Sequence, residues 1–201
     1  GLLNAANNPA ELANMSTKFD VNVFNFSVAV ANNNLTINDL FSGDNLETKL
    51  FQGNESANFR IDAQIFGPAI AFKTGKWGFG INSIANIKAN AINIDSNLGD
   101  ALQNGNLSNL FSQTSLNSNE NQRLNATTWG EVSFNVARTI VDVPKYKINV
   151  GANLRLLFPG AYANFSATNL NGTLVNNFGD ISLINASANI NLSYAGVLAN
   201  K

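Results

Sequence analysis

Hydrophobic and polar residues alternate along most of the chain after Lys18. A period of two predicts β-strands in which one face meets an apolar environment and the other a polar one. Helical spacing is confined to short stretches between these segments. The chain is therefore predicted to be nearly all β, with strands over residues 19–30, 59–72, 77–90, about 127–141, 146–156 and, as the sixth, around 181–194.

The alternation changes phase at two places. One change falls at Val23-Phe24, and the other falls between Phe66 and Phe72. A slip of one residue moves every following side chain to the opposite face. We therefore expect a bulge, or a change in what each face meets, at both places.

Only the first residues of the chain have the pattern of a helix. Asn8 stands before Pro9, and Glu11 follows in what would be the first turn. Asn is a favoured N-cap, Pro suits the first helical position, and an acidic residue suits the first turn. One or two turns of helix are predicted within residues 1–15.

The connections between the predicted strands alternate in length. Residues 73–76 and 142–145 form tight turns, whereas the other connections take about 26 and about 30 residues. Outer-membrane barrels have short turns at one end and long loops at the other. Strands of about 12–17 residues also exceed the roughly 5–6 residues of soluble strands. The pattern predicts an antiparallel transmembrane β-barrel, and since five or six strands cannot close one, we expect the chain to be part of a larger barrel or its sequence to be incomplete.

The charged residues within the predicted strands fall on the polar side of the alternation. A lipid-facing Arg or Lys near the bilayer centre costs about 2–4 kcal/mol, whereas a wet interior tolerates it. The polar residues predicted to face the barrel lumen are Arg60, Asp62, Lys88, Glu131 and Arg155.

Three aromatic residues lie near the predicted strand ends. Trp77 and Tyr146 each begin a strand beside a tight turn, and Trp129 lies near the opposite end of its strand. Tyr and Trp favour the headgroup layer because each has an apolar body and a polar tip. We expect these three residues to mark the two membrane boundaries.

Composition excludes several classes of function. The 201 residues include 12 basic and 13 acidic residues, which leaves no basic stripe for nucleic acid. The chain has no His and no Cys, so disulfides, Cys- or His-bound metals and Ser-His dyads are excluded. No catalytic residue, metal site or cofactor is predicted, and we do not expect an enzyme. The alternative reading of the same pattern is a soluble β-sandwich or solenoid.

The first long connection holds a group of oxygen ligands. Asp39, Asp44, Asn45 and Glu47 lie close together in sequence but lack the spacing of an EF-hand. The spacing favours a solvated polar loop over a Ca²⁺ site.

The opening Asn8-Pro9-Ala10, followed by Glu11-Leu12-Ala13, resembles the N-terminal motif of FadL-like outer-membrane barrels, and in particular of PorV-type barrels of Bacteroidota. Residues 148–157 are similar to a glycine-containing strand of those families. The resemblance spans about residues 1–165 and implies a barrel of about 14 strands, of which this chain would form the N-terminal part. It implies that residues 1–17 form a plug, with Asn8, Pro9 and Ala10 as its motif, and that residues 18–201 belong to the barrel.

The resemblance leads to three hypotheses of function. The first is a scaffold or binding subunit of a secretion or surface-assembly complex, which would bind protein partners through long loops at about 32–57 and 94–125. The second is a plugged, FadL-like channel for small or hydrophobic solutes. Both imply contact with lipid in the outer membrane of a diderm bacterium, after removal of a signal peptide. The third is a soluble, secreted, β-rich adhesin.

Overall fold

The computed structural model describes most of the chain. The described residues are 1–36, 38, 39, 42, 45–51, 55–96, 111–177 and 180–196. Nearly all of their regular structure is β, which confirms the predicted fold class at the level of an all-β chain.

The described helices are short and lie in the first quarter of the chain. They are α1 (Leu2–Ala5), the 3₁₀ helix η1 (Pro9–Asn14) and α3 (Leu46–Leu50). Within the described residues, no helix is long and apolar enough to cross a membrane. The η1 helix confirms the helical turns predicted around Pro9, whereas the spacing of residues did not indicate α1 or α3.

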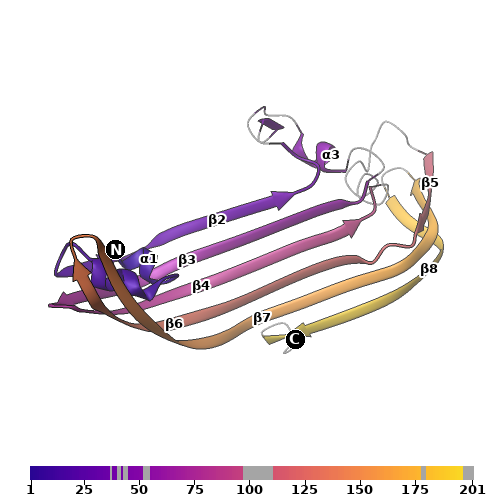
Figure 1. The fold of residues 1–201 in the computed structure, drawn as a ribbon. Coiled ribbons are helices and arrows are strands. Elements are labelled where there is room, and N and C mark those ends of the chain that lie inside the picture. The colour runs from indigo at the N-terminus through magenta and orange to yellow at the C-terminus, as the bar shows by residue number, and fades with distance from the viewer. Residues whose placement is uncertain are drawn as a thin grey trace. The chain divides into compact units, whose positions relative to one another are not determined.

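Eight strands form the described part of the sheet (Figure 1). They are β1 (Phe19–Asn22), β2 (Asn25–Asn32), β3 (Ala57–Thr74), β4 (Trp77–Ile94), β5 (Phe111–Ser118), β6 (Gln122–Val143), β7 (Tyr146–Asn177) and β8 (Asp180–Ala195). The sheet is antiparallel, in the order β1-β3-β4-β6-β7-β5, with β2 also paired to β3 and β8 to β7. No pairing among the described residues joins β1 or β2 to β8, so the sheet is open.

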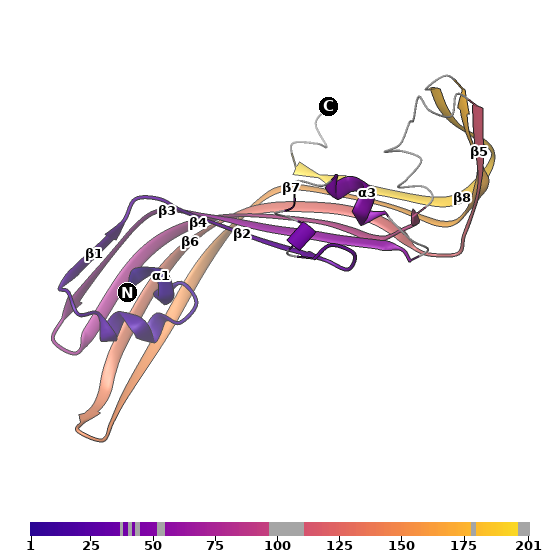
Figure 2. The same ribbon diagram turned by 90° about the horizontal axis from the view of Figure 1, so that it is seen from above.

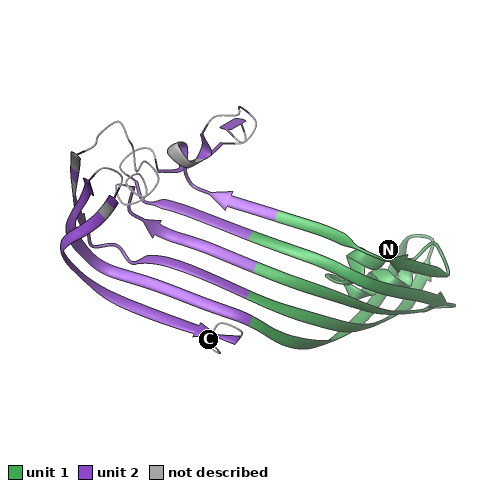
Figure 3. Cartoon of the chain, turned by 180° about the vertical axis from the view of Figure 1, so that it is seen from behind, with its two compact units in different colours: residues 1–28, 62–87, 128–160 green, residues 29–61, 88–127, 161–201 purple. Residues whose placement is uncertain are grey.

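The chain forms two compact units, and four long strands contribute segments to both (Figure 3). Unit 1 contains the N-terminal helices and the two tight turns, and unit 2 contains the long connections. The segments of unit 1 are 1–28, 62–87 and 128–160, and those of unit 2 are 29–61, 88–127 and 161–201.

The tight turns of unit 1 lie where the sequence predicts them. Between β3 and β4, Gly75 has φ of 56°, a left-handed conformation that Gly adopts without a Cβ clash. Pro144 and Lys145 connect β6 to β7. Both predicted turns are therefore confirmed.

Both predicted phase changes are present. The interruption at Val23 and Phe24 separates β1 from β2. In β3, Gln64 lies on the face that carries Asn86, to which it donates a hydrogen bond. Ala69 and Ala71 are buried on that same face. An even-numbered residue and two odd-numbered residues share one face only if the alternation changes phase between them. Pro68 lies between them, where the missing N–H suits a local break in the ladder.

The core of unit 1 joins the N-terminal segment to the strands. Buried side chains of α1 and η1 pack against small residues of β3 and β6, as Figure 2 shows for the helices lying across the strands. The cluster consists of Leu2, Ala5, Leu12, Ala13, Met15, Ala69, Ala71 and Ala137.

Unit 2 has its own smaller core. Leu116 of β5 packs with Leu170 and Leu174 of β7, and Ala188 of β8 covers them. The pairing of β5 with β7 runs from Phe111 opposite Asn177 to Ser118 opposite Leu170.

Candidate functional site

The sheet of unit 1 has two faces of opposite chemistry. On one, which we call the polar face, Asn82, Asn86, Glu131, Ser133, Asn135 and Thr139 are buried. On the other, the apolar face, large hydrophobic side chains are open to the surroundings. They include Phe72, Ile81, Phe134, Ile140, Val150 and Leu154. This distribution is the reverse of that in a water-soluble β-sheet, where the hydrophobic face is the covered one.

Glu131 is the centre of a hydrogen-bond network on the polar face. Its Oε1 accepts from Asn86 Nδ2 at 3.0 Å and from Trp129 Nε1 at 2.7 Å. Its Oε2 forms an ion pair with Arg155 Nη1 at 3.3 Å. Gln64 Nε2 extends the network by donating to Asn86 Oδ1 at 2.9 Å. A buried carboxylate needs such partners because its desolvation is costly.

A second group of amides lies farther along the polar face. Asn135 Nδ2 donates to Asn82 Oδ1 at 2.7 Å. Among the described residues of this face in unit 1, four buried amide atoms have no hydrogen-bond partner: Asn82 Nδ2, Asn135 Oδ1, Asn149 Oδ1 and Asn153 Oδ1. The polar face therefore has donor and acceptor capacity that the protein does not use.

The N-terminal segment, residues 1–15, lies on this polar face. Arg155 Nη2 donates to the carbonyl of Ala6 at 2.6 Å, and Lys73 Nζ donates to that of Met15 at 2.9 Å. The N–H of Leu2 donates to Asp20 Oδ2 at 3.0 Å. Charged residues of three strands thus hold the main chain of the segment.

Glycines of the strands allow the segment to approach closely. A Cβ at Gly78 would lie 2.5 Å from the carbonyl carbon of Leu12, and one at Gly151 would lie 2.4 Å from the backbone nitrogen of Ala10. Real Cβ atoms essentially never approach that closely. Gly in a strand often marks such a close approach, so the sequence held this signal, which our interpretation did not use.

The motif residues Asn8, Pro9 and Ala10 shape the segment at this contact. The Asn8 side chain caps η1 by accepting from the N–H of Ala10 at 3.3 Å, and Pro9 stands at the first position of the helix. Pro9 and Ala10 are also the residues that contact Gly151. Asn14 extends the contact, because its Oδ1 accepts from Asn149 Nδ2 at 2.7 Å.

The five charged residues predicted for the polar side are not all in one cluster. Glu131 and Arg155 are brought together in unit 1. Asp62, which is partly buried, lies two residues before Gln64 in β3 and so shares its face. Arg60 is exposed and Lys88 is partly buried, and both belong to unit 2.

Two of the three aromatic residues begin a strand beside a tight turn, as the pattern predicts, and the third lies deeper in its strand. Their place at the membrane boundaries stays a prediction. Trp77 and Tyr146 begin β4 and β7 beside the tight turns and are 41% and 58% exposed. Trp129 lies well inside β6, which begins at Gln122, and its indole bonds to Glu131. Its position therefore corrects the expectation of a strand-end residue. The strand extends about five residues beyond the predicted start, and the indole N–H takes a carboxylate partner.

The expectation that the charged residues within the strands fall on the polar side is wrong for Arg138. This residue lies on the apolar face, between Val136 and Ile140 in the alternation of β6, and it is exposed. Its guanidinium carbon is 4.9 Å from the centre of the Trp77 ring. It is thus a cation placed over an aromatic ring on a face that is otherwise almost wholly apolar.

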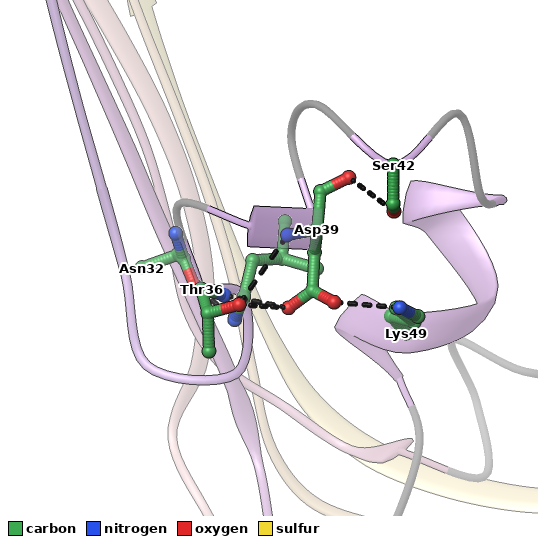
Figure 4. Close-up of polar contacts among 6 residues, drawn as sticks. Asn32, Thr36, Asp39, Ser42 and Lys49 are labelled. Carbon is green, nitrogen blue, oxygen red and sulfur yellow. Dashed lines mark hydrogen bonds and ion pairs between the residues drawn. The ribbon is translucent and has the colours of Figure 1, made fainter.

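Described residues of the first long connection, in unit 2, form a group of hydrogen bonds around Asp39 (Figure 4). Asp39 Oδ1 accepts from Lys49 Nζ at 2.6 Å, and Oδ2 accepts from Thr36 N at 2.8 Å and Thr36 Oγ1 at 2.7 Å. Lys49, followed by the two Thr36 donors, holds the pKa of the Asp39 carboxyl well below its usual range. Asn32 Oδ1 accepts from the N–H groups of Asn34 and Leu35 at the start of the loop.

The hydrogen bonds that Asp39 accepts are relevant to the alternative interpretation that this loop binds Ca²⁺. The Asp39 carboxylate already has three donors, one of them an ammonium. Asp44 and the side chain of Glu47 lie outside the described residues. Across the part of the chain that the structure describes, no group of three or more metal-binding side chains is present.

Comparison with known proteins identifies a family. No curated protein matches this chain, and no solved structure matches it. Residues 9–201 match the family described as "Family of unknown function (DUF5723)". The match includes η1 and every described strand and leaves out only α1 among the described elements, so the chain belongs to the DUF5723 family.

Proposed function

We propose that the protein is a β-barrel of the outer membrane of a diderm bacterium, whose N-terminal segment fills the interior and whose long loops bind protein partners. In this role it serves as a scaffold or binding subunit of a secretion or surface-assembly complex. A barrel requires that the two open edges of the sheet find partners, because unpaired backbone groups in hydrocarbon cost several kcal/mol each.

The single observation that carries the proposal is the reversed distribution of side chains in unit 1. On the apolar face Phe134 is 43% exposed, Val150 50% and Leu154 65%, whereas Ser133 and Asn135 on the polar face are 1% and 5% exposed. Water would penalise this arrangement by about 25 cal/mol for each Å² of exposed apolar surface. Lipid removes the penalty, which also argues against a soluble adhesin.

The N-terminal segment supports the second element of the proposal, a filled interior. In a barrel with lipid outside, the polar face is the inner one. The segment is held there by Arg155 and Lys73 and fits against Gly78 and Gly151. Its motif Asn8-Pro9-Ala10 resembles that of the plug of FadL-like and PorV-type barrels, which favours a related role here.

The first long connection supports the binding role. Asp39, Thr36 and Lys49 give it internal hydrogen bonds and an ion pair (Figure 4). A loop with a fixed conformation loses less entropy when a partner binds. A filled interior and a hydrogen-bonded turn in the first long connection together favour the scaffold hypothesis.

Transport is the second candidate function, and a separate observation favours it. Four buried amide atoms of the polar face lack partners, among them Asn149 Oδ1 and Asn153 Oδ1 beneath the N-terminal segment. Once the segment moves away, these groups would meet water or a polar solute. A plug-gated channel would use this reserve of donors and acceptors.

Site-directed labelling tests the membrane position. The chain has no Cys, so each single-cysteine variant can be labelled at one position without background labelling. Variants at Val150 and Leu154 are compared with variants at Ser133 and Asn153. After reconstitution and labelling with bimane, quenching by nitroxide lipids should be strong at Val150 and Leu154 and weak at the other two positions. The opposite pattern would overturn the membrane proposal.

Affinity purification in mild detergent tests the scaffold role. The wild type should retain a stoichiometric partner, and Asp39→Asn, which weakens the loop, should retain less of it. Asp142→Asn is the matched control because it changes an exposed acid beside the tight turn between β6 and β7. A wild-type protein that purifies alone would contradict the scaffold role and leave the channel as the candidate function.

A further inference from the structure

The apolar face of unit 1 carries one cation, Arg138, among its β6 residues, which otherwise run Val132, Phe134, Val136 and Ile140. Its position is close to the tight turns. The N–H of Thr139, the next residue, donates to the carbonyl of Lys76 in the turn between β3 and β4 at 2.8 Å. Arg138 therefore lies near the end of the apolar face, where a charge on the outside of a membrane protein meets headgroups.

The partner of Arg138 within the protein is an aromatic ring. Its guanidinium carbon is 4.9 Å from the Trp77 ring centre, and Trp77 in turn stacks on Phe79 at 6.0 Å and 13°. Across the described residues, no carboxylate pairs with Arg138. An aromatic ring offers no acceptor oxygen, so the N–H groups of the guanidinium retain their capacity to bind an oxyanion.

An apolar groove begins at the same place. A cavity of about 350 Å³ is lined by Trp77, Val136, Arg138, Ile140, Val150 and Ala152, among others. A second cavity, of about 520 Å³, shares Val136 and Ala152 with the first. It continues away from the tight turns along Phe79, Phe134 and Leu154. Ala152 lines both cavities, and because its side chain is small it leaves space for a ligand at this point.

The charges around this end favour an anionic ligand. Counted over both faces, six basic residues near the tight turns outnumber the acidic residues Glu11, Asp20 and Asp142. The basic residues are Lys18, Lys73, Lys76, Arg138, Lys145 and Lys147. Of these, Lys147 pairs with Asp142 at 4.0 Å, and Lys73 binds a backbone carbonyl. Clusters of this kind next to a bilayer attract anionic lipids.

We propose that Arg138, Trp77 and the adjoining groove bind one anionic glycerophospholipid. Its phosphate accepts hydrogen bonds from the Arg138 guanidinium, with Lys76 adding positive charge. One acyl chain lies in the groove from Val136 and Ala152 toward Phe134 and Leu154. The inference rests on the proposed membrane position of the apolar face, and it adds a preferred lipid and a defined site to that proposal.

The experiment is lipid retention measured by native mass spectrometry on the full chain released from detergent. The protein is supplied with equal amounts of dimyristoyl phosphatidylglycerol and dimyristoyl phosphatidylcholine. One Arg beside anionic headgroups gives a preference of about fivefold. We expect that preference in the wild type, and its loss in Arg138→Gln. Ala152→Trp, which fills the groove and keeps the charge, should reduce retention of both lipids.

The matched control is Arg123→Gln. It removes the same charge from the same strand but in unit 2, and it should keep the wild-type preference. Equal phosphatidylglycerol retention by wild type and Arg138→Gln, or equal losses in Arg123→Gln and Arg138→Gln, would overturn the site. Failure of the nitroxide-quenching test would overturn the membrane position itself. A protein that passes that test and shows no lipid preference refutes only the lipid site.

Discussion

Leu12 lies against Gly78 so closely that a Cβ at position 78 would come within 2.5 Å of the carbonyl carbon of Leu12. The backbone of η1 therefore rests directly on the backbone of β4. Because backbone atoms cannot rotate aside as a flexible side chain can, any larger residue at position 78 must displace the N-terminal segment.

We predict that Gly78→Ala loosens the N-terminal segment. Overpacking of this kind costs about 1–3 kcal/mol, and the cost falls on the contact rather than on the strands. Limited proteolysis within residues 1–15 should be several times faster than in the wild type. Gly130→Ala is the control, because its Cβ would lie at an ordinary 3.8 Å from Phe158. Equal cleavage rates in all three proteins would contradict the close fit.

Replacing Arg155 by Gln should weaken both the network around Glu131 and the hold on Ala6. The Glu131 side chain is 9% exposed and would lose its only ion pair among the described residues. The Arg155 side chain is 42% exposed, so solvent screening reduces the loss to about 1–2 kcal/mol of unfolding free energy. Tryptophan fluorescence reports the unfolding; Trp77 and Trp129 both contribute to it, and Trp129 donates to the Glu131 carboxylate.

Lys147→Gln provides the comparison for that measurement. Its pair with Asp142 is 4.0 Å long and both side chains are more exposed than Glu131. An exposed pair contributes between zero and about 1 kcal/mol, so this change should have the smaller effect. A larger loss in Lys147→Gln than in Arg155→Gln would show that the Glu131 network is not important for stability.

The hydrogen bonds and the ion pair of Asp39 in the first long connection should weaken in acid. Lys49 and Thr36 depress the pKa of Asp39 in the folded loop, so the carboxylate stabilises the folded form above its unfolded pKa of about 4. That stabilisation falls as the pH drops below about 4 toward the folded pKa. Protease cleavage within residues 32–51 should therefore rise on acidification. Asp39→Asn should be cleaved readily at neutral pH and respond little to acid, and a response equal to the wild type would refute the role of Asp39.

Removal of residues 1–15 tests the channel hypothesis. If the N-terminal segment blocks a passage, its deletion should raise the single-channel conductance in planar bilayers. Gly78→Ala should give an intermediate rise, because it displaces the segment without removing it. An unchanged current after deletion would count against a plug-gated pore and in favour of the scaffold role.

Strand alternation and turn residues predicted much of unit 1 correctly. The turn at Gly75, the turn after Val143 and the interruption at Val23 all follow from local chemistry. Each depends on a few neighbouring residues, such as a Gly with positive φ or a change in the parity of hydrophobic positions. Local signals of this kind can be read without knowledge of the fold.

Unit 2 was predicted less well, because its strands depend on pairing rather than on pattern. The only hydrophobic residues of β5 are Phe111 and Leu116, which do not follow a period of two. All residues of the strand nevertheless pair with β7. The second half of β7 was also missed. There Asn169 has φ of 54°, and the register with β8 shifts on both sides of Asn171. Such irregularities break the period that a pattern search requires.

The contacts of the candidate site were only partly visible in the sequence. The polar character of Glu131 and Arg155 was evident, but their meeting depends on the pairing of β6 with β7. The close contact that Gly78 and Gly151 allow becomes evident only when the position of η1 beside them is known. Contacts between residues more than a hundred positions apart, such as Arg155 with Ala6, require the folded chain.

Three polar contacts between the sheet and the N-terminal segment reach main-chain atoms of the segment. Lys73 and Arg155 bind carbonyl oxygens, and Asp20 binds an amide N–H. These contacts do not depend on the side chains of the segment, so its sequence matters mainly through the buried Leu12, Ala13 and Met15 and through the bond of Asn14 to Asn149.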